Sequence, residues 1–149
     1  MNTGDGMSAA ENIAAFRKLI DVGFTKGDLS VVDELGSPAG IEHQRGNRPG
    51  IEGTKATITT LHTWFSDFEL TIVKLVADGD TVWSLNRARG VNTGSIMGFP
   101  PTGKSFEIDV MDVVRFEDGK MVEHWGVPDQ LGMLMQLGLV QRPQPAAAR

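Results

Sequence analysis

Hydrophobic positions follow two different periods along the chain, a helical one first and a strand-like one afterwards. Apolar residues recur every three or four positions over residues 8–27, 28–35 and 54–65. This spacing puts them on one side of a helix, so each segment predicts an amphipathic helix. Ser8 and Glu11 have the spacing of a capping box, which marks the start of the first helix.

After residue 65 the period changes to two. Apolar and polar residues alternate over 68–78, 81–90, 105–116 and 121–127, which predicts four strands. The first two are separated only by GD and the last two by the tight turn EDGK. Each pair therefore predicts a β-hairpin.

The expected order is three helices, a run of antiparallel strands and one short helix over 129–139, with a further short strand around GIEHQRG, 40–46, between loops. Helices segregated from a meandering sheet are typical of the α+β class. We expect a cone-shaped α+β barrel in which three N-terminal helices pack on a strongly curved, mainly antiparallel sheet and enclose a cavity. The prediction is one domain, 8–140, between a disordered leader, 1–7, and a disordered tail, 141–149.

Composition and charge narrow the class of partner. The chain has 149 residues, a net charge of −5 and a pI near 5.1, which argues against nucleic acid and anionic membranes as partners. Cysteine is absent, which removes thiolate nucleophiles and thiolate metal sites and fits a cytoplasmic protein. The three histidines lack the short spacing of a helix-borne zinc pair, and we expect neither metal nor cofactor. No tyrosine is present to bind an oxyanion.

The stretch MVEHWGVPDQLG, residues 121–132, carries the main catalytic candidate, Asp129. It stands between an apolar strand and a helix, and apolar neighbours such as Trp125 disfavour the charged form of a carboxyl group. A carboxyl group with a raised pKa can act as both acid and base. The alternative is an N-cap, because Asp between Pro128 and a helix is a common capping arrangement.

A second carboxylate, Asp112, lies on the more apolar side of the strand 105–116. An unpaired charge there would cost several kcal/mol. Asp112 is therefore expected either to pair with an arginine or to serve as a second catalytic carboxylate. Its side of the strand is shared by the following residues: Phe106, Ile108, Val110, Val114 and Phe116.

The histidines and aromatic residues supply the other candidates. His43 is predicted either to contact a substrate carbonyl or to be a solvated loop residue. His124 has the opposite strand parity to Trp125 and Asp129, so it is expected to face away from them unless Gly126 marks a bulge. A pocket for a flat apolar substrate is predicted from several side chains, with core packing as the alternative for each: Trp125, His124, Trp64, Phe65, Phe16, Phe99 and Met111. Arg87 is predicted either to clamp an anionic substrate group or to form ion pairs on an outer or dimer face.

Four stretches in fixed order resemble a known family. They are GDLSVVDEL (27–35), IEH (41–43), GFPPTGKSFEID (98–109) and VVRFEDGKMVEHWGVPDQLGMLMQLG (113–138). Together they resemble the SnoaL-like polyketide cyclases of the nuclear-transport-factor-2-like superfold. The resemblance implies a cone-like α+β barrel, a homodimer and a cofactor-free intramolecular aldol ring closure on an aromatic polyketide ester. It further implies that Asp129 is the acid/base and that His43 lines the pocket.

The sequence is compatible with three functions. The first is a cyclase that uses Asp129. The second is an epoxide hydrolase of the limonene-epoxide type, in which Asp112, an arginine from 87, 89 or 115, and Asp129 would form the catalytic set. The third is a non-catalytic dimer that binds small lipophilic molecules, in which Asp129 is used only as a helix cap and side chains fill the cavity.

Overall fold

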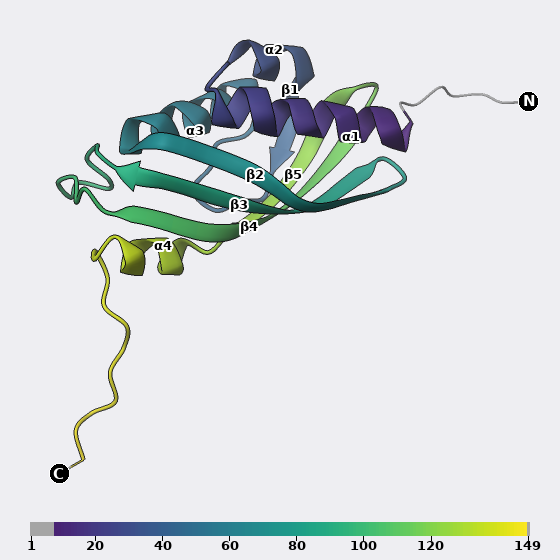
Figure 1. The fold of residues 1–149 in the computed structure, drawn as a ribbon. Helices are drawn as coiled ribbons and strands as arrows, with labels where there is room; N and C mark the ends of the chain where they lie inside the picture. The colour runs from purple at the N-terminus through teal and green to yellow at the C-terminus, as the bar shows by residue number, and fades with distance from the viewer. Residues whose placement is uncertain (1–7, 149) are drawn as a thin grey trace, which may run out of the picture.

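The helices of the first half of the chain cover one face of a five-stranded sheet (Figure 1), which confirms the predicted α+β class. The computed structural model describes residues 8–148. The helices are α1 (Ala9–Lys18), the π-helix η1 (Leu19–Thr25), α2 (Ser30–Leu35), α3 (Gly50–Trp64) and α4 (Gln130–Gln136). The strands are β1 (Gly36–Glu42), β2 (Phe65–Asp78), β3 (Thr81–Asn92), β4 (Ser105–Glu117) and β5 (Lys120–Pro128).

The first predicted helix is present but changes its winding halfway. Ser8 and Glu11 form the expected capping box, in which the Ser8 hydroxyl accepts from the Glu11 N–H at 3.2 Å and the Glu11 carboxylate accepts from the Ser8 N–H at 2.7 Å. From Leu19 onward the helix is a π-helix. Wider π turns occur often at functional sites, and this one faces the cavity described below.

The sheet has the strand order β1-β5-β4-β3-β2. The two predicted hairpins, β2–β3 and β4–β5, are confirmed, and β3 pairs with β4 in antiparallel register. Only β1 runs parallel to its neighbour, β5. β1 begins before the short strand predicted around 40–46 and ends at Glu42, because it is positioned by pairing with a distant strand rather than by its own Gly- and Pro-containing sequence.

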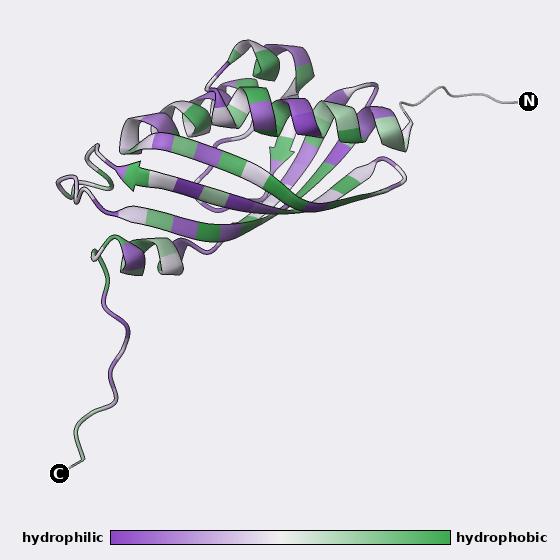
Figure 2. Ribbon diagram, in the orientation of Figure 1, coloured by the Kyte–Doolittle hydropathy of each residue, from purple (hydrophilic) through white to green (hydrophobic). Residues whose placement is uncertain are grey.

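Hydrophobic and hydrophilic residues alternate along the strands (Figure 2), so the two faces of the sheet differ. The face under the helices is buried, and the predicted side of β4 lies there. The opposite face, called the outer face below, exposes large apolar side chains. Cross-strand register places Trp83 beside Val113 and Val113 beside Trp125, while Met111 pairs with Val127 in the next row.

Helix α4 closes an edge of β4. β5 pairs with β4 only as far as Val110, so the first residues of β4 have no strand on that side. The side-chain amide of Gln136 takes this place, accepting from the Glu107 N–H at 2.7 Å and donating to the Glu107 carbonyl at 3.0 Å. The Asp129 N–H also donates to the Asp109 carbonyl at 3.1 Å. Both peptide groups of Glu107 and the carbonyl of Asp109 are thereby satisfied at this edge.

The ends of the chain were predicted to be unstructured. Residues 141–148 form neither helix nor strand, and the predicted leader, 1–7, and Arg149 lie outside the described residues. Among the helices of residues 8–148, none has the length and apolar character needed to span a bilayer.

Candidate functional site

A cavity of about 810 Å³ lies between the buried face of the sheet and the helices α1, η1 and α3. Its wall is mostly apolar, and it is built from α1, η1, α3 and strands of the sheet. Representative lining residues are Phe16, Ile20, Trp64, Phe65, Ile108 and Val110. A space of this size, with few polar groups, suits a flat organic molecule.

Three titratable side chains from three strands meet on this wall. His124 of β5 lies between two carboxylates, with Nε2 2.9 Å from Asp112 Oδ1 and Nδ1 2.9 Å from Glu42 Oε1. The parallel pairing of β1 with β5 places Glu42 opposite His124, and the pairing of β4 with β5 places Asp112 on the same side of the sheet. All three residues line the cavity.

Two buried polar residues of β3, Asn86 and Ser84, form a hydrogen-bonded chain that ends on the Asp112 carboxylate. The Asn86 amide donates to Asp112 Oδ2 at 2.7 Å and to the Ser84 hydroxyl at 3.0 Å. Asn86 is fully buried and Asp112 is 8% exposed. Asn86 Oδ1 has no hydrogen-bond partner among the described residues, a cost of about 1–3 kcal/mol.

The charges of this group follow from its contacts. Burial by itself lowers the pKa of the His124 imidazole, but the hydrogen bonds to Asp112 and Glu42 outweigh burial and raise this pKa to about 9. Burial also opposes ionisation of Glu42, yet the hydrogen bonds from His124 and the Gln44 N–H hold the pKa of Glu42 below its ordinary value. At neutral pH His124 is therefore an imidazolium that donates to both neighbours.

This arrangement can move a proton at the cavity wall. Each oxygen of the Asp112 carboxylate accepts one hydrogen bond, from His124 or from Asn86. A carboxylate oxygen has two lone pairs, so each retains one position for a proton. Of the two alternatives predicted for Asp112, the arginine partner is wrong, because His124 takes that place; a role as a catalytic carboxylate stays a prediction.

The predicted position of Asp129 inside the pocket is wrong. Asp129 is exposed, does not line the cavity, and accepts from the Gly132 N–H at 2.9 Å as the N-cap of α4. His124 and Trp125 point to opposite faces of β5, as the alternation predicted. The face that lies toward the cavity, however, is the one that carries His124. Trp125 lies on the outer face and is 37% exposed.

His43 lines the cavity at its solvent-exposed mouth, as the resemblance implied. Its ring stacks on Trp125, with the ring centroids 4.6 Å apart and the planes 6° from parallel. Its Nε2 lies 2.9 Å from Glu123 Oε1. His43 therefore neighbours the site without joining the His124 cluster.

The remaining predicted substrate-binding residues divide into two groups. Phe16, Trp64 and Phe65 line the cavity. Phe99 and Met111, 51% and 47% exposed, do not, because Phe99 lies in the loop after β3 and Met111 has the opposite parity to Asp112. Arg87 is also outside: it contacts Asp109 at 3.0 Å on the outer face, as its alternative prediction expected.

The catalytic set expected for an epoxide hydrolase is not assembled. Arg87 and Arg89 pair with acidic side chains away from the cavity, Arg115 pairs with Glu117 and with Glu123 of the cavity wall, and Asp129 caps α4. The sequence prediction missed Glu42 and Asn86. For Asn86 a signal existed, because alternation in TVWSLNRARG puts Ser84 and Asn86 on the buried face with Val82 and Ala88.

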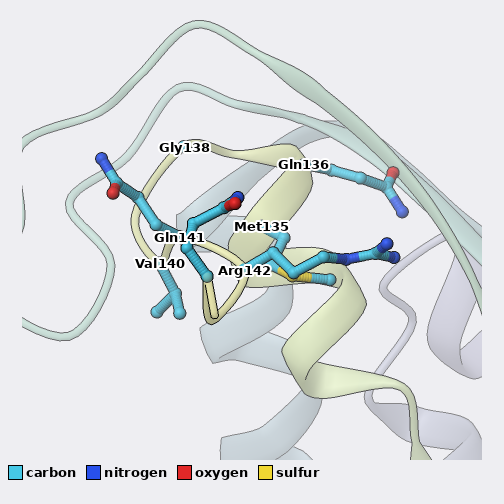
Figure 3. Close-up of a pocket in the computed structure, with 7 residues that line it drawn as sticks. Met135, Gln136, Gly138, Val140, Gln141 and Arg142 are labelled. Atoms are coloured by element: carbon cyan, nitrogen blue, oxygen red, sulfur yellow. The ribbon is translucent and has the colours of Figure 1, made fainter. Parts of the chain in front are cut away.

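A second, shallower depression of about 610 Å³ lies at the end of α4 (Figure 3). It is lined by Met135, Gln136, Gly138, Val140, Gln141, Arg142 and Gln144. Arg142 is the only titratable side chain in this lining, so the depression offers no acid/base group. Across residues 8–148, no group of three or more His, Asp or Glu side chains has the geometry of a metal site.

Comparison with known proteins identifies relatives over most of the chain. The family model described as SnoaL-like polyketide cyclase matches residues 14–137. Aklanonic acid methyl ester cyclase DnrD from Streptomyces peucetius is 32% identical, over 68% of this chain and 70% of its own length. Nogalonic acid methyl ester cyclase from Streptomyces nogalater is 30% identical, over 68% of this chain and 75% of its own length.

Solved structures with the same fold include IdmH from Streptomyces antibioticus, with a TM-score of 0.75 and 33% identity over 85% of this chain and 98% of IdmH. TsrD from Streptomyces laurentii has a TM-score of 0.82 and 28% identity, over 90% of this chain and 99% of TsrD. An LEH-like epoxide hydrolase from M. tuberculosis is 18% identical with a TM-score of 0.67, and so shares the fold alone.

Proposed function

The chain belongs to the SnoaL-like polyketide cyclase family, and we propose that it closes a ring in a small polyketide by an intramolecular aldol reaction in which Asp112 is the acid and base. It is an enzyme of the SnoaL-like type. The observation that supports this assignment is the Glu42–His124–Asp112 cluster on the wall of a large apolar cavity.

In the proposed reaction, Asp112 removes a proton from a carbon that lies between two carbonyl groups of the substrate. The resulting enolate carbon attacks a ketone of the same molecule and forms the new carbon–carbon bond. The alkoxide that results takes the proton back from Asp112. Product and substrate are isomers, so this reaction consumes no cofactor or co-reactant.

The residues around Asp112 have supporting roles. The His124 imidazolium and the Asn86 amide fix the two oxygens of the carboxylate and orient it toward the cavity. His124 also balances the charge of Asp112, and Glu42 keeps His124 protonated. The apolar wall excludes water from the enolate, and Phe16, with its neighbours, supplies a flat surface for the substrate.

A turnover assay with aklanonic acid methyl ester and nogalonic acid methyl ester, the compounds named for two relatives, tests this proposal. Asp112→Asn should lower kcat by about 10² to 10⁴, the usual contribution of a general base. Asp129→Asn is the matched control and should keep kcat within about a factor of three, because Asn caps a helix as well as Asp does. Full activity of Asp112→Asn, or loss of activity in Asp129→Asn alone, would overturn the assignment.

The non-catalytic alternative expected Asp129 to cap a helix and side chains to fill the cavity. The first expectation agrees with the structure, but the cavity of about 810 Å³ is open. The open cavity, with a charged cluster on its wall, favours the enzyme over a passive scaffold.

We also propose that the protein forms a homodimer through the outer face. Trp83, Met111, Trp125 and Val127 are exposed on adjoining strands, and a contiguous apolar patch of this kind usually marks an interface. Sedimentation of the wild type should give a dimer, and Trp83→Glu should give a folded monomer. A monomeric wild type at micromolar concentration would contradict the proposal.

A further inference from the structure

The mouth of the cavity carries two arginines that have no acidic partner among residues 8–148. We propose that Arg45 and Arg48 bind a free carboxylate of the substrate, so that this enzyme takes a polyketide acid. The inference rests on the proposed cyclase function and adds a substrate class to it. The two relatives described above are named for methyl esters, in which the corresponding acid group is masked.

Both arginines lie in the loop between β1 and α3, and both line the cavity while being exposed to solvent. Within residues 8–148, no carboxylate lies within 4 Å of either guanidinium. The three arginines of the sheet differ, since each forms an ion pair: Arg87 with Asp109, Arg89 with Glu69, and Arg115 with Glu117 and Glu123. The loop therefore presents two positive charges that the described protein does not neutralise.

The acidic residues of the cavity do not supply the missing partner, because each is already paired. Glu42 and Asp112 share His124. Glu123 contacts Arg115 at 2.9 Å and His43 at 2.9 Å. Binding an anion at the two arginines therefore breaks no existing ion pair.

The loop is held in place at both ends. On the β1 side, the Gln44 N–H donates to Glu42 Oε1 at 2.7 Å. On the α3 side, the Arg48 carbonyl lies so close to Gly53 that a Cβ at this position would overlap it. Anchoring of this kind reduces the entropy that the loop loses when a ligand binds.

The start of α3 adds to the positive potential at the mouth. Helix α3 begins at Gly50, its N-cap Pro49 supplies no side-chain hydrogen bond, and Gly50 and Gly53 line the cavity. The free N–H groups at the start of a helix attract anions. They act in the same direction as Arg45 and Arg48.

Charge also fixes the orientation of the substrate. The inner cluster contains two acidic side chains, Glu42 and Asp112, and one basic side chain, His124, so acidic groups outnumber basic ones there. A carboxylate is repelled from this inner end and attracted to the arginines at the mouth. The uncharged carbonyl-bearing part of the molecule is then directed toward Asp112.

Direct binding of a matched ligand pair tests the inference without turnover. The probes are anthraquinone-2-carboxylate and its methyl ester, followed by isothermal titration calorimetry at low and high salt. The wild type should bind the acid about tenfold or more tightly than the ester, as expected for charge-assisted contacts. Salt should reduce this ratio, because the mouth is exposed.

The double variant Arg45→Gln/Arg48→Gln should bind the acid about tenfold more weakly and the ester with unchanged affinity. Unchanged ester binding also shows that the variant is folded. Arg17→Gln, which removes an exposed arginine outside the cavity, is the control and should change neither affinity. Equal wild-type affinity for acid and ester, or equal loss of both in the double variant, overturns the inference.

The outcomes separate this inference from the proposed function. If the protein turns over a polyketide ester but binds the probe acid and its ester equally well, the cyclase function stands and the carboxylate site is rejected. Arginine-dependent binding of the acid together with no turnover of any polyketide, acid or ester, retains the site and removes the cyclase.

Discussion

The stability of the protein should fall steeply as the pH rises from 7 to about 10, because of His124. The pKa of His124 is raised from 6.5 to about 9 by Asp112 and Glu42. A group with a raised folded-state pKa stabilises the protein fully below its unfolded pKa, and this contribution is lost as the pH rises through the folded value. The contribution of this cluster to the free energy of unfolding can therefore be measured at alkaline pH.

The magnitude follows from the difference between the two pKa values. This difference corresponds to a stabilisation of the folded state by about 3 kcal/mol at low pH. About 2.5 kcal/mol of it remains at pH 7 and almost none at pH 10. For a chain of this size the change is equivalent to roughly 10 °C in Tm. Cysteine and tyrosine are absent, so neither a thiol nor a phenol titrates in the same window.

Urea unfolding, followed by the fluorescence of the three tryptophans, measures the free energy of unfolding at each pH. The wild type should lose about 2–3 kcal/mol between pH 7 and pH 10, and His124→Gln should lose much less over the same range. An NMR titration of the His124 ring in the wild type provides a second measurement if the variant does not fold. Identical pH profiles for the two proteins, or a ring that titrates near 6.5, would refute the charge assignment of the site.

Three further perturbations test separate parts of the structure. Glu42→Gln removes one of the two carboxylates that hold His124 protonated. The pKa of His124, measured by NMR, should therefore fall, and the alkaline limit of activity should move with it to lower pH. An unchanged pKa of His124 would contradict the role of Glu42. Gly53→Ala should destabilise the fold by about 1–3 kcal/mol in urea unfolding and weaken acid binding, because its Cβ would displace the Arg48 carbonyl. Gly23→Ala is the control: a Cβ there has ordinary contact distances, so this variant should lose little stability. Asp129→Ala should lose about 1 kcal/mol of stability through the missing cap, whereas Asp129→Asn should keep it; equal losses would argue against capping.

The sequence predicted most of the fold because the relevant signals are local. Alternation identified β2 to β5, the short turns identified both hairpins, and the Ser8–Glu11 spacing identified the start of α1. The bounds of β1 were missed because its parallel partner, β5, lies about 80 residues away in sequence. Non-local pairing leaves no periodic pattern in a strand as rich in Gly and Pro as β1.

The site was predicted only in part, for a physical reason. Alternation on β5 separates His124 from Trp125, but it does not tell which of the two faces lies under the helices. The apolar face was assigned to the interior, whereas it forms the exposed outer face, and the more polar face with His124 lines the cavity. Asp112 was identified because an acid among buried apolar residues needs a partner; that this partner is a histidine depends on cross-strand register.

The amide of Gln136 against the main chain of Glu107 has a consequence for how copies of this protein meet. By occupying both peptide groups, it removes the hydrogen-bonding template on which a foreign strand would grow. Lateral sheet extension, the usual route from an open strand to fibrils, is thereby blocked at this border of β4. At this border, association is left to side chains, whose shape can discriminate between partners in a way that peptide groups, identical in every protein, do not.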